Sequence, residues 1–545
     1  MKRRTLIKGM AVTLPSLWLS RAVGNNFFNE LDSLETITKG PFKPTWESLQ
    51  NYKTPEWYRN AKFGMWAHWG PQCQPEAGDW YARGMYQEGS AQYKFHLQKY
   101  GHPSVFGFKD VINHWKAEKW NPEELVALYK NTGAQYFMAL ANHHDNFDLY
   151  DSNYQKQWNA TKIGPQKDLI GGWAKAARNN GLPFGVSVHA SHAWLFYEAA
   201  QLSDKKGELA GVPYDGKMTK ADGKGKWWDG LDPQELYAQN HQLSKGWNWE
   251  WGKEVTKPTK AYCTKFYNRT INLINKYSPD VVYFDDSQLP LWPISDVGLR
   301  LAAHLYNKSI KEYGELRAVL TGKILDENQR KAMVWDIERG QANEIQPLPW
   351  QTDTCIGGWH YDRALYERDG YKTSKTVIQT LVDIVSKNGN LMLNIPVRGD
   401  GTIDEKERKI VEEIGAWMKV NSESIYDTRP WKIFGEGPAL EVSSKLASQN
   451  FNEAKGKAFS NEDIRFATKG DVLYATSMGW PEDGKLTIKS LATASKHFTK
   501  EIQKIEWLPQ KESLTFVRNE NGLTIFLPEK PFDALSYANV IKIFS

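Results

Sequence analysis

The amino-acid sequence predicts an α/β protein: a TIM-like (β/α) barrel over residues 41–427, followed by a C-terminal antiparallel β-sandwich over residues 428–545. Two observations lead to this prediction. In the first part, short apolar runs alternate with segments whose apolar residues recur at helical spacing. In the second part, short runs of alternating polar and apolar residues are separated by Gly-Asp and Asn-Gly turns. Strands that alternate with helices form parallel sheets, whereas strands joined by tight turns pair antiparallel.

The helix and strand signals of the first part follow one another in order. The segment 121–133 (NPEELVALYKNTG) begins with an asparagine cap and a first-turn proline and ends at a glycine, which predicts a helix. Further helices are predicted at residues 168–181, 262–277, 373–389 and 404–421. Strands are predicted at residues 61–70, 134–141, 182–189, 281–284, 331–340 and 390–397. The polar stretch 202–257 is expected to be a long insertion in a barrel loop.

Residues 1–24 predict an export signal. Basic residues come first, a short apolar stretch follows, and small residues end it. The pair Arg3-Arg4 resembles the start of a bacterial twin-arginine signal. The apolar stretch is too short to span a membrane. We therefore expect a bacterial protein that is periplasmic or secreted and has no membrane span.

The composition gives no support to a nucleic-acid-binding role. The net charge is +5, but the predicted signal holds five basic residues and no acidic one, so the rest of the chain has no net charge. The three cysteines lie far apart, which allows one disulfide but neither a disulfide framework nor a zinc ribbon. The chain also has 24 tryptophans and 25 tyrosines. Aromatic faces fill protein cores, and they also pack well against sugar rings.

Polar residues follow several of the predicted strands. In a (β/α) barrel the active site lies at the C-terminal ends of the strands, which here carry His68, His143, His144, His189, Asp285 and Glu338. The simplest interpretation is that the acidic residues cap turns, their commonest role. A second interpretation is a metal site formed by His68, His143, His144 and Asp145. Adjacent residues on a strand point to opposite sides, however, which disfavours a site that uses two neighbouring histidines.

A third interpretation is cleavage of a glycosidic bond. This reaction needs one carboxylate to attack the anomeric carbon or activate water, and a second carboxyl group to protonate the leaving oxygen. A cluster of histidines beside Trp69 and Trp80 suits a sugar with several hydroxyls and one apolar face. Such a site needs no metal ion and no other cofactor, so we expect none.

Several motifs resemble the α-L-fucosidase family, glycoside hydrolase family 29. In order, they are KFGMWAHWG, GDWYARGMY, ANHHDNFDLYDS, KDLIGGWAKAARNNGLPFGV, PDVVYFDD and the stretch beginning KNGNLMLNIPVRGDGTIDEKERK. The resemblance extends from about Tyr52 to Trp431. It implies a retaining exo-glycosidase that releases terminal α-L-fucose from oligosaccharides or polysaccharides by double displacement.

The resemblance also implies roles for individual residues. Asp285 matches the nucleophile, and Asp286 is its rival because it stands where the family usually has glycine. Glu338 and Glu344 compete for the role of general acid/base, and Glu338 is favoured because it directly follows a strand. The sugar is expected to contact His68, Trp69, Asp79, Trp80, His143, His144, His189, Tyr283 and Trp359.

Some of these residues depart from the family pattern. Asp79 replaces the usual glutamate, Tyr283 replaces a tryptophan, and His189 or Ser187 stands at the end of a strand that is usually rich in tyrosine. These departures leave open a related sugar such as L-galactose, which differs from L-fucose by one hydroxyl at C6. A catalytically inactive carbohydrate-binding protein on the same scaffold is a further alternative, although it would be expected to lack one of the two carboxylates.

Overall fold

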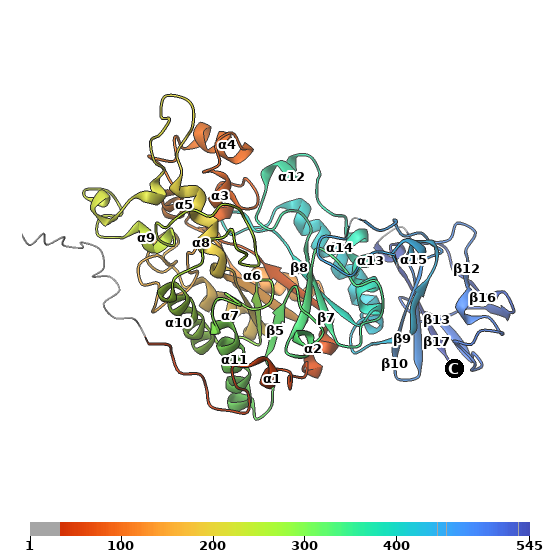
Figure 1. The fold of residues 1–545 in the computed structure, drawn as a ribbon. Helices are drawn as coiled ribbons and strands as arrows, with labels where there is room; N and C mark the ends of the chain where they lie inside the picture. The colour runs from red at the N-terminus through yellow and green to blue at the C-terminus, as the bar shows by residue number, and fades with distance from the viewer. Residues whose placement is uncertain (1–32, 444, 454, 532–533) are drawn as a thin grey trace, which may run out of the picture. The chain divides into compact units, whose positions relative to one another are not determined.

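Eight parallel strands close into a barrel in the computed structural model (Figure 1), which describes residues 33–443, 445–453, 455–531 and 534–545. The strands pair in chain order, and the last pairs with the first. They are β1 (Phe63–Ala67), β2 (Tyr136–Asn142), β3 (Phe184–Val188), β4 (Val281–Phe284), β5 (Val319–Gly322), β6 (Val334–Glu338), β7 (Trp350–Cys355) and β8 (Gly389–Asn394). The predicted fold class is confirmed. The predicted export signal lies outside the described residues.

Two strands, β5 and β7, were not predicted from the sequence. The first has only four residues, VLTG, and the second, WQTDTC, is mostly polar. Both are held by pairing on each side rather than by their own composition: β5 pairs with β4 and β6, and β7 pairs with β6 and β8. Every residue of β5 and β7 is buried.

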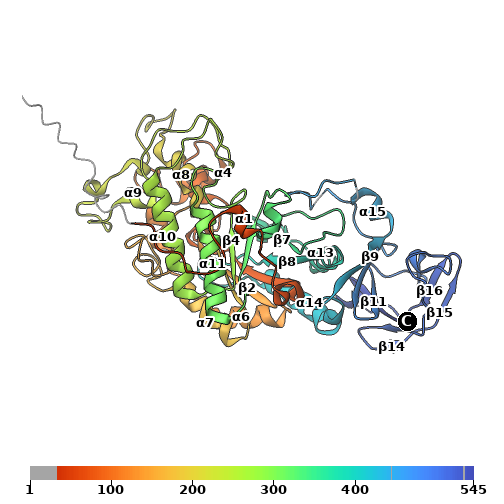
Figure 2. The ribbon, with the colours of Figure 1, turned by 60° about the horizontal axis from the view of Figure 1, so that its bottom comes forward.

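Long helices cover most of the barrel. They are α6 (Pro122–Asn131), α7 (Leu169–Asn179), α10 (Lys260–Tyr277), α11 (Val297–Tyr313), α13 (Ser374–Ser386) and α14 (Glu405–Asn421). In Figure 2, α10 and α11 run side by side. Asn121 accepts a hydrogen bond from the Glu124 amide and caps α6 as predicted. Between β5 and β7 the described chain has no α-helix, only a 3-10 turn at Gln329–Lys331.

The remaining helices are short. They are α1 (Trp46–Leu49), α2 (Glu56–Ala61), α3 (Tyr81–Gly84), α4 (Ala91–Lys99), α5 (Phe108–His114), α8 (Ala193–Phe196), α9 (Pro233–Leu236), α12 (Arg363–Glu367) and α15 (Pro438–Ser443). The stretch 202–257 contains only α9 and single 3-10 turns, as expected for a loop insertion. No helix of the described residues is long and apolar enough to cross a membrane.

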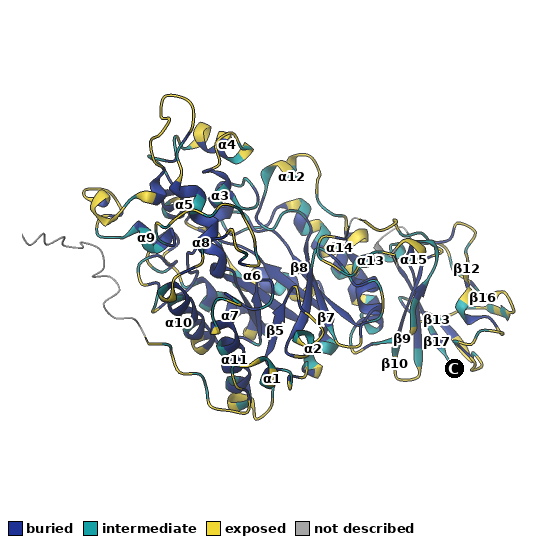
Figure 3. Ribbon diagram, viewed as in Figure 1, coloured by how far each residue is buried: buried dark blue, intermediate teal, exposed yellow. Residues whose placement is uncertain are grey.

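The barrel strands are buried along their length, as their colour in Figure 3 shows. Large side chains fill the barrel interior, and one of them needs a glycine beside it. A β-carbon on Gly64 of β1 would lie 2.4 Å from the ring of Tyr136 on β2, far inside contact distance. Gly64 therefore makes room for this ring at the lower end of the barrel.

The C-terminal region consists of two antiparallel sheets, as predicted. One has the order β14-β13-β17-β11-β10-β9 and the other β12-β16-β15. Their strands are β9 (Arg429–Glu436), β10 (Ile464–Lys469), β11 (Val472–Ser477), β12 (Lys485–Ile488), β13 (Lys504–Trp507), β14 (Glu512–Ser513), β15 (Phe516–Asn519), β16 (Gly522–Phe526) and β17 (Asn539–Phe544). Helix α13 of the barrel contacts β9 and β10. All three cysteines are buried and free, so the disulfide that the sequence allowed is absent.

Candidate active site

A cavity of about 660 Å³ opens at the C-terminal ends of the barrel strands. Its volume falls within the range typical of small-molecule sites, roughly 300–1,000 Å³. Nine of the residues expected from the sequence line it: His68, Asp79, Trp80, His143, His189, Tyr283, Asp285, Glu338 and Trp359. Residues from seven separate segments of the chain thus meet at the face where (β/α) barrels carry their chemistry.

Asp285 directly follows β4 and is held from two sides. Its Oδ2 lies 3.1 Å from Nδ1 of His189 and 3.0 Å from Nε2 of His144. Its Oδ1 accepts a hydrogen bond from Nζ of Lys323. Burial alone would raise the pKa of Asp285, but the charge of Lys323 and the contact with His189 outweigh it and hold that pKa well below its ordinary value. Asp285 is therefore an oriented carboxylate at neutral pH.

The neighbouring Asp286 has different partners. Its Oδ1 lies 3.0 Å from Nε2 of His192, and its Oδ2 accepts a 2.7 Å hydrogen bond from the Ser191 hydroxyl. Both partners belong to the loop after β3. Asp286 is 4% exposed and borders the same cavity. Its two oxygens are thus engaged in holding the β3 loop to the end of β4.

Glu338 is the last residue of β6. Its Oε2 accepts a 2.6 Å hydrogen bond from Nζ of Lys323. Burial raises the pKa of Glu338 to about 7; the charge of Lys323 opposes this rise, and the carboxyls of Asp353 and Asp285 add to it. A carboxyl group with such a pKa holds its proton at mildly acidic pH and can exchange it near neutrality, which is the property of a general acid/base.

Its rival Glu344 lies in the connection between β6 and β7 and is exposed. Two residues later, the backbone amide of Gln346 donates a 3.2 Å hydrogen bond to the carbonyl of Lys387. Lys387 lies two residues before β8, so the chain has already reached the N-terminal end of the barrel at this point. Glu344 is not among the residues that line the cavity.

Lys323 links the two carboxyl groups and was not identified from the sequence. It follows β5, is buried, and contacts both Asp285 and Glu338. Burial would lower the pKa of Lys323, but the two carboxyls outweigh this effect and hold that pKa well above its ordinary value. The ammonium group is therefore a permanent cation in the site. Because both carboxyl oxygens contact one nitrogen, they are separated by no more than about two hydrogen-bond lengths.

Tyr283, on β4, closes the floor of the cavity below these groups. Its hydroxyl donates a 2.9 Å hydrogen bond to Oδ2 of Asp353 on β7. Burial, reinforced by nearby Asp336, holds the pKa of Asp353 well above its ordinary value. Asp353 therefore holds its proton more firmly than an ordinary aspartic acid does.

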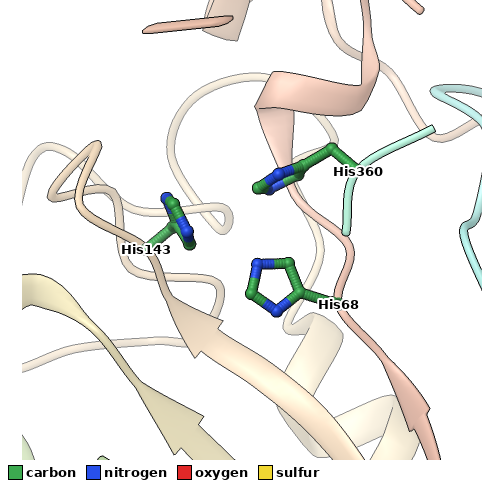
Figure 4. A group of neighbouring side chains, drawn as sticks. All are labelled: His68, His143 and His360. Atoms are coloured by element: carbon green, nitrogen blue, oxygen red, sulfur yellow. The ribbon is translucent and has the colours of Figure 1, made fainter. Parts of the chain in front are cut away.

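Three histidines from separate segments face one another (Figure 4), and two of them, His68 and His143, line the cavity. This histidine trio consists of His68 after β1, His143 after β2 and His360 after β7, and their ring nitrogens lie within 4.8 Å of one another. Both ring nitrogens of His68 and of His360 are buried without a hydrogen-bond partner among the described residues. Burial and the neighbouring imidazoles hold the pKa values of His68 and His143 well below the ordinary value. A neutral imidazole with unpaired nitrogens, such as that of His68, is suited to bind a hydroxyl group or a transition metal.

The two kinds of ligand make different demands on this spacing. Tetrahedral zinc, with bonds of ~2.0–2.1 Å, needs every pair of ligand nitrogens at about 3.3 Å. A hydroxyl that bridges two rings tolerates a separation of about two hydrogen-bond lengths. Separations of up to 4.8 Å are compatible with a bridging sugar hydroxyl, and they include the shorter spacing that zinc needs. The histidine trio can therefore hold either kind of ligand.

Asp79 and its neighbours form the opposite wall. The Asp79 carboxylate accepts hydrogen bonds from the backbone amides of Trp359, at 3.0 Å, and His360, at 2.5 Å. It thereby fixes the loop that carries the third histidine of the trio. Trp80 has a left-handed backbone with φ of 60°, which is rare for a bulky residue. Its ring contacts Trp249 from the long insertion, which also lines the cavity.

Two of the expected sugar contacts lie outside the cavity lining. Trp69 is buried, donates to the carbonyl of Arg398 at 2.8 Å, and packs among Trp115, Trp120 and Trp173. It follows His68 in the chain and points to the other side, so it belongs to the packing behind the strand. His144 lies behind Asp285, and its Nδ1 donates to the carbonyl of His189 at 2.7 Å. Its contact with Asp285 makes it a support of the carboxylate.

The sequence profile of the alpha-L-fucosidase family matches residues 31–423, and that of the alpha-L-fucosidase C-terminal domain matches residues 457–544. The chain belongs to the alpha-L-fucosidase family. It is thus a glycoside hydrolase, and the family resemblance noted in its motifs is confirmed.

The chain is similar in sequence to relatives from animals and in structure to proteins from bacteria. The chain is 25% identical to rat tissue alpha-L-fucosidase over 90% of its own length and 89% of the relative's, and 24% identical to human plasma alpha-L-fucosidase over the same shares. It superposes on the Thermotoga maritima alpha-fucosidase in complex with fucose with a TM-score of 0.64 and 23% identity, covering 92% of this chain and all of the other. An alpha-L-fucosidase from Vibrio sp. strain EJY3 gives a TM-score of 0.59 and 18% identity, with coverage of 92% and 74%.

Several cavity residues gave little signal in the sequence. Lys323 follows a four-residue strand, and Trp249 lies in the polar insertion. Asn450 and Phe451 come from the C-terminal region, more than 100 residues beyond the strand that they touch. Only the Gly-Lys pair at the end of the run AVLTGK could have marked Lys323 as one more polar residue at a strand end.

Proposed function

We propose that the protein hydrolyses terminal α-L-fucosides with retention of configuration, with Asp285 as nucleophile and Glu338 as general acid/base. The observation that carries this proposal is the shared contact of the two carboxyl groups with Lys323. Retaining glycosidases hold their carboxyl groups ~5–5.5 Å apart, whereas inverting ones need ~6.5–9.5 Å to admit a water. Two oxygens bound to one nitrogen fit the shorter spacing.

In the first step, the sugar lies in the cavity with its hydroxyls on the histidine trio and its apolar face against tryptophan. A carboxylate oxygen of Asp285 forms a bond to the anomeric carbon. The bond from that carbon to the leaving oxygen breaks, and the proton of Glu338 moves to this oxygen, so that a neutral alcohol departs. The low pKa of Asp285 and the raised pKa of Glu338 give each group the protonation state that this step requires.

In the second step, Glu338 takes a proton from water while the water oxygen attacks the anomeric carbon and displaces Asp285. Ester formation has by then removed the negative charge of Asp285, which had helped to raise the pKa of Glu338. The pKa of Glu338 therefore falls between the two steps, as a change from acid to base demands. Lys323 stays charged throughout and holds both side chains in place.

Substitution of the two adjacent aspartates tests the assignment. Asp285→Asn is expected to lose orders of magnitude in turnover while folding normally, because a neutral amide cannot attack the anomeric carbon. Azide should restore part of the activity and give a glycosyl azide of inverted configuration. Asp286→Asn is the matched control, and we expect it to retain the nucleophile. Azide rescue of Asp286→Asn alone would move the nucleophile by one residue, and rescue of neither would refute double displacement.

The sugar itself is proposed to be L-fucose rather than L-galactose. Trp80, Trp249 and Trp359 give the cavity an aromatic lining that suits a methyl group better than a hydroxymethyl group. Apolar pockets reject an added hydroxyl only by about 100-fold. We therefore expect kcat/KM for an aryl α-L-fucoside to exceed that for the aryl α-L-galactoside by about 10- to 100-fold. The reverse preference would identify an L-galactosidase, and hydrolysis of neither would favour an inactive carbohydrate-binding protein.

A fucose-containing oligosaccharide or polysaccharide outside the cytoplasm is the proposed natural substrate. The support for an external location is the export signal predicted in residues 1–24. Periplasmic or secreted enzyme would meet such glycans before their sugars are taken up.

A further inference from the structure

Two large apolar side chains stand exposed at the cavity mouth, on the side of Glu338. Phe451 is 58% exposed and Ile324 is 52% exposed, and both line the cavity. Single exposed apolar residues are ordinary on protein surfaces. Here, however, both are attached to the catalytic groups: Ile324 follows Lys323 in the chain, and the amide of Phe451 donates a 2.8 Å hydrogen bond to the carbonyl of Glu338.

The segment that carries Phe451 is fixed against the end of β6. We call residues 450–453 the rim segment. Asn450 accepts a 3.0 Å hydrogen bond from the Glu338 amide, and the amide of Glu453 donates a 3.1 Å hydrogen bond to the carbonyl of Arg339. The side chains of Arg339 and Glu453 also form an ion pair at 3.1 Å. The rim segment therefore holds Phe451 in a defined place beside the general acid.

Backbone strain accompanies this arrangement. Phe451 has φ of 56° and Arg339 has φ of 45°, both in the left-handed region that bulky residues rarely adopt. Such a conformation is unfavourable for a bulky residue, and it persists where the surrounding bonds enforce it. An exposed phenylalanine in this conformation gains little from folding, since most of its ring stays in water. Its position is better explained by a ligand that covers it.

We propose that Phe451 and Ile324 form the subsite for the leaving group, and that its occupant is the pyranose to which fucose is attached. This inference rests on the proposed role of Glu338 as general acid. The leaving oxygen must lie within hydrogen-bonding reach of that acid, so the ring attached to this oxygen lies on the same side of the cavity. There the apolar face of a hexopyranose stacks on the phenyl ring of Phe451, while Ile324 contacts its edge.

The test compares two substrates that share fucose and differ in the leaving group. The first is 2′-fucosyllactose or 3-fucosyllactose, whichever the wild-type protein cleaves faster. The second is α-L-fucosyl fluoride, whose leaving group has no ring. In Phe451→Ala, the ratio of kcat/KM for the fucosyllactose to kcat/KM for the fluoride should fall about 5- to 30-fold. Phe451→Trp, which keeps an aromatic face, should retain most of the ratio.

Phe526→Ala is the matched control, because Phe526 is also an exposed phenylalanine, at 40%, and lies on β16 of the C-terminal region. Its ratio should equal that of the wild-type protein. Equal losses on both substrates in Phe451→Ala would show that the ring supports the fucose site as a whole. A lower ratio together with a shifted alkaline limb of the kcat/KM profile would show that the ring acts through Glu338, and an unchanged ratio would show that no sugar covers it. Each of these results overturns the inference. A wild-type protein that cleaves neither substrate would instead overturn the proposed function together with this inference.

Discussion

Replacement of Lys323 by methionine should shift the pH dependence of the reaction to higher pH. The ammonium group contacts both Asp285 and Glu338, and methionine keeps most of its length without the charge. At an effective dielectric constant of ~20, unit charges ~3 Å apart attract by roughly 5.5 kcal/mol, which sets an upper limit of about 4 pKa units. Shifts for a carboxyl beside one cation are typically about 1–3 units, and we expect that range here.

The direction in which the two pKa values shift follows from the charges. Loss of a positive neighbour disfavours the ionised form of a carboxyl group, so the pKa values of Asp285 and Glu338 both rise. The proposed mechanism requires Asp285 to be ionised, so the acidic limb of the kcat/KM profile moves to higher pH. It also requires Glu338 to be protonated, so the alkaline limb moves up from about 7. The bell-shaped dependence of kcat/KM on pH should therefore move as a whole to higher pH by about 1–3 units, even if the maximal rate falls.

The measurement is kcat/KM for an aryl fucoside between pH 3 and 10, beside thermal melts that confirm folding at each pH. Lys323→Arg is the matched control: it keeps the charge and should leave both limbs near their wild-type positions. If the limbs of the kcat/KM profile stay in place in Lys323→Met, or move to lower pH, the claim that this lysine sets the protonation of the two carboxyls is refuted.

The remaining predictions concern the acid, metal ions and export. Glu338→Ala should cleave a natural disaccharide very slowly but retain appreciable activity on a dinitrophenyl fucoside, which leaves without protonation; the same pattern in Glu344→Ala would reverse the assignment. Exhaustive dialysis against a chelator should leave activity intact. Added zinc should inhibit in competition with substrate by binding the histidine trio. Activity that is lost to the chelator and restored by zinc would refute a metal-free mechanism. Protein recovered from an exporting bacterial host should begin near Gly24, and replacement of the twin arginines by lysines should block export; an intact Met1 on exported protein would argue against a cleaved signal.

The fold and much of the site could be predicted because their signals are local. Apolar runs that end in His68, Asp285 or Glu338 mark both a strand and the functional residue at its end. The two missed strands lack such runs and are stabilised by their neighbours. Trp69 was expected in the cavity because it adjoins His68, but adjacent residues at a strand end point to opposite sides, and this one packs in the core.

The residues that the sequence did not reveal depend on contacts between distant segments. Lys323 acquires its role only when β4, β5 and β6 lie side by side, and no spacing in the chain expresses that arrangement. Phe451 lies in the region assigned to the β-sandwich, where nothing marks it as a neighbour of Glu338. Residues of this kind become visible only once the barrel is closed.

The attachment of the rim segment to β6 has a consequence for how this protein can evolve and be engineered. A gene fragment that stopped at residue 427 would encode both carboxyl groups but not the asparagine side chain that holds the backbone of one of them. A barrel transferred without the C-terminal region would therefore lack a hydrogen bond that fixes the end of β6. Conversely, recombination that exchanges only the rim segment between homologues would offer a short route to new glycan preferences while the fucose pocket stays unchanged.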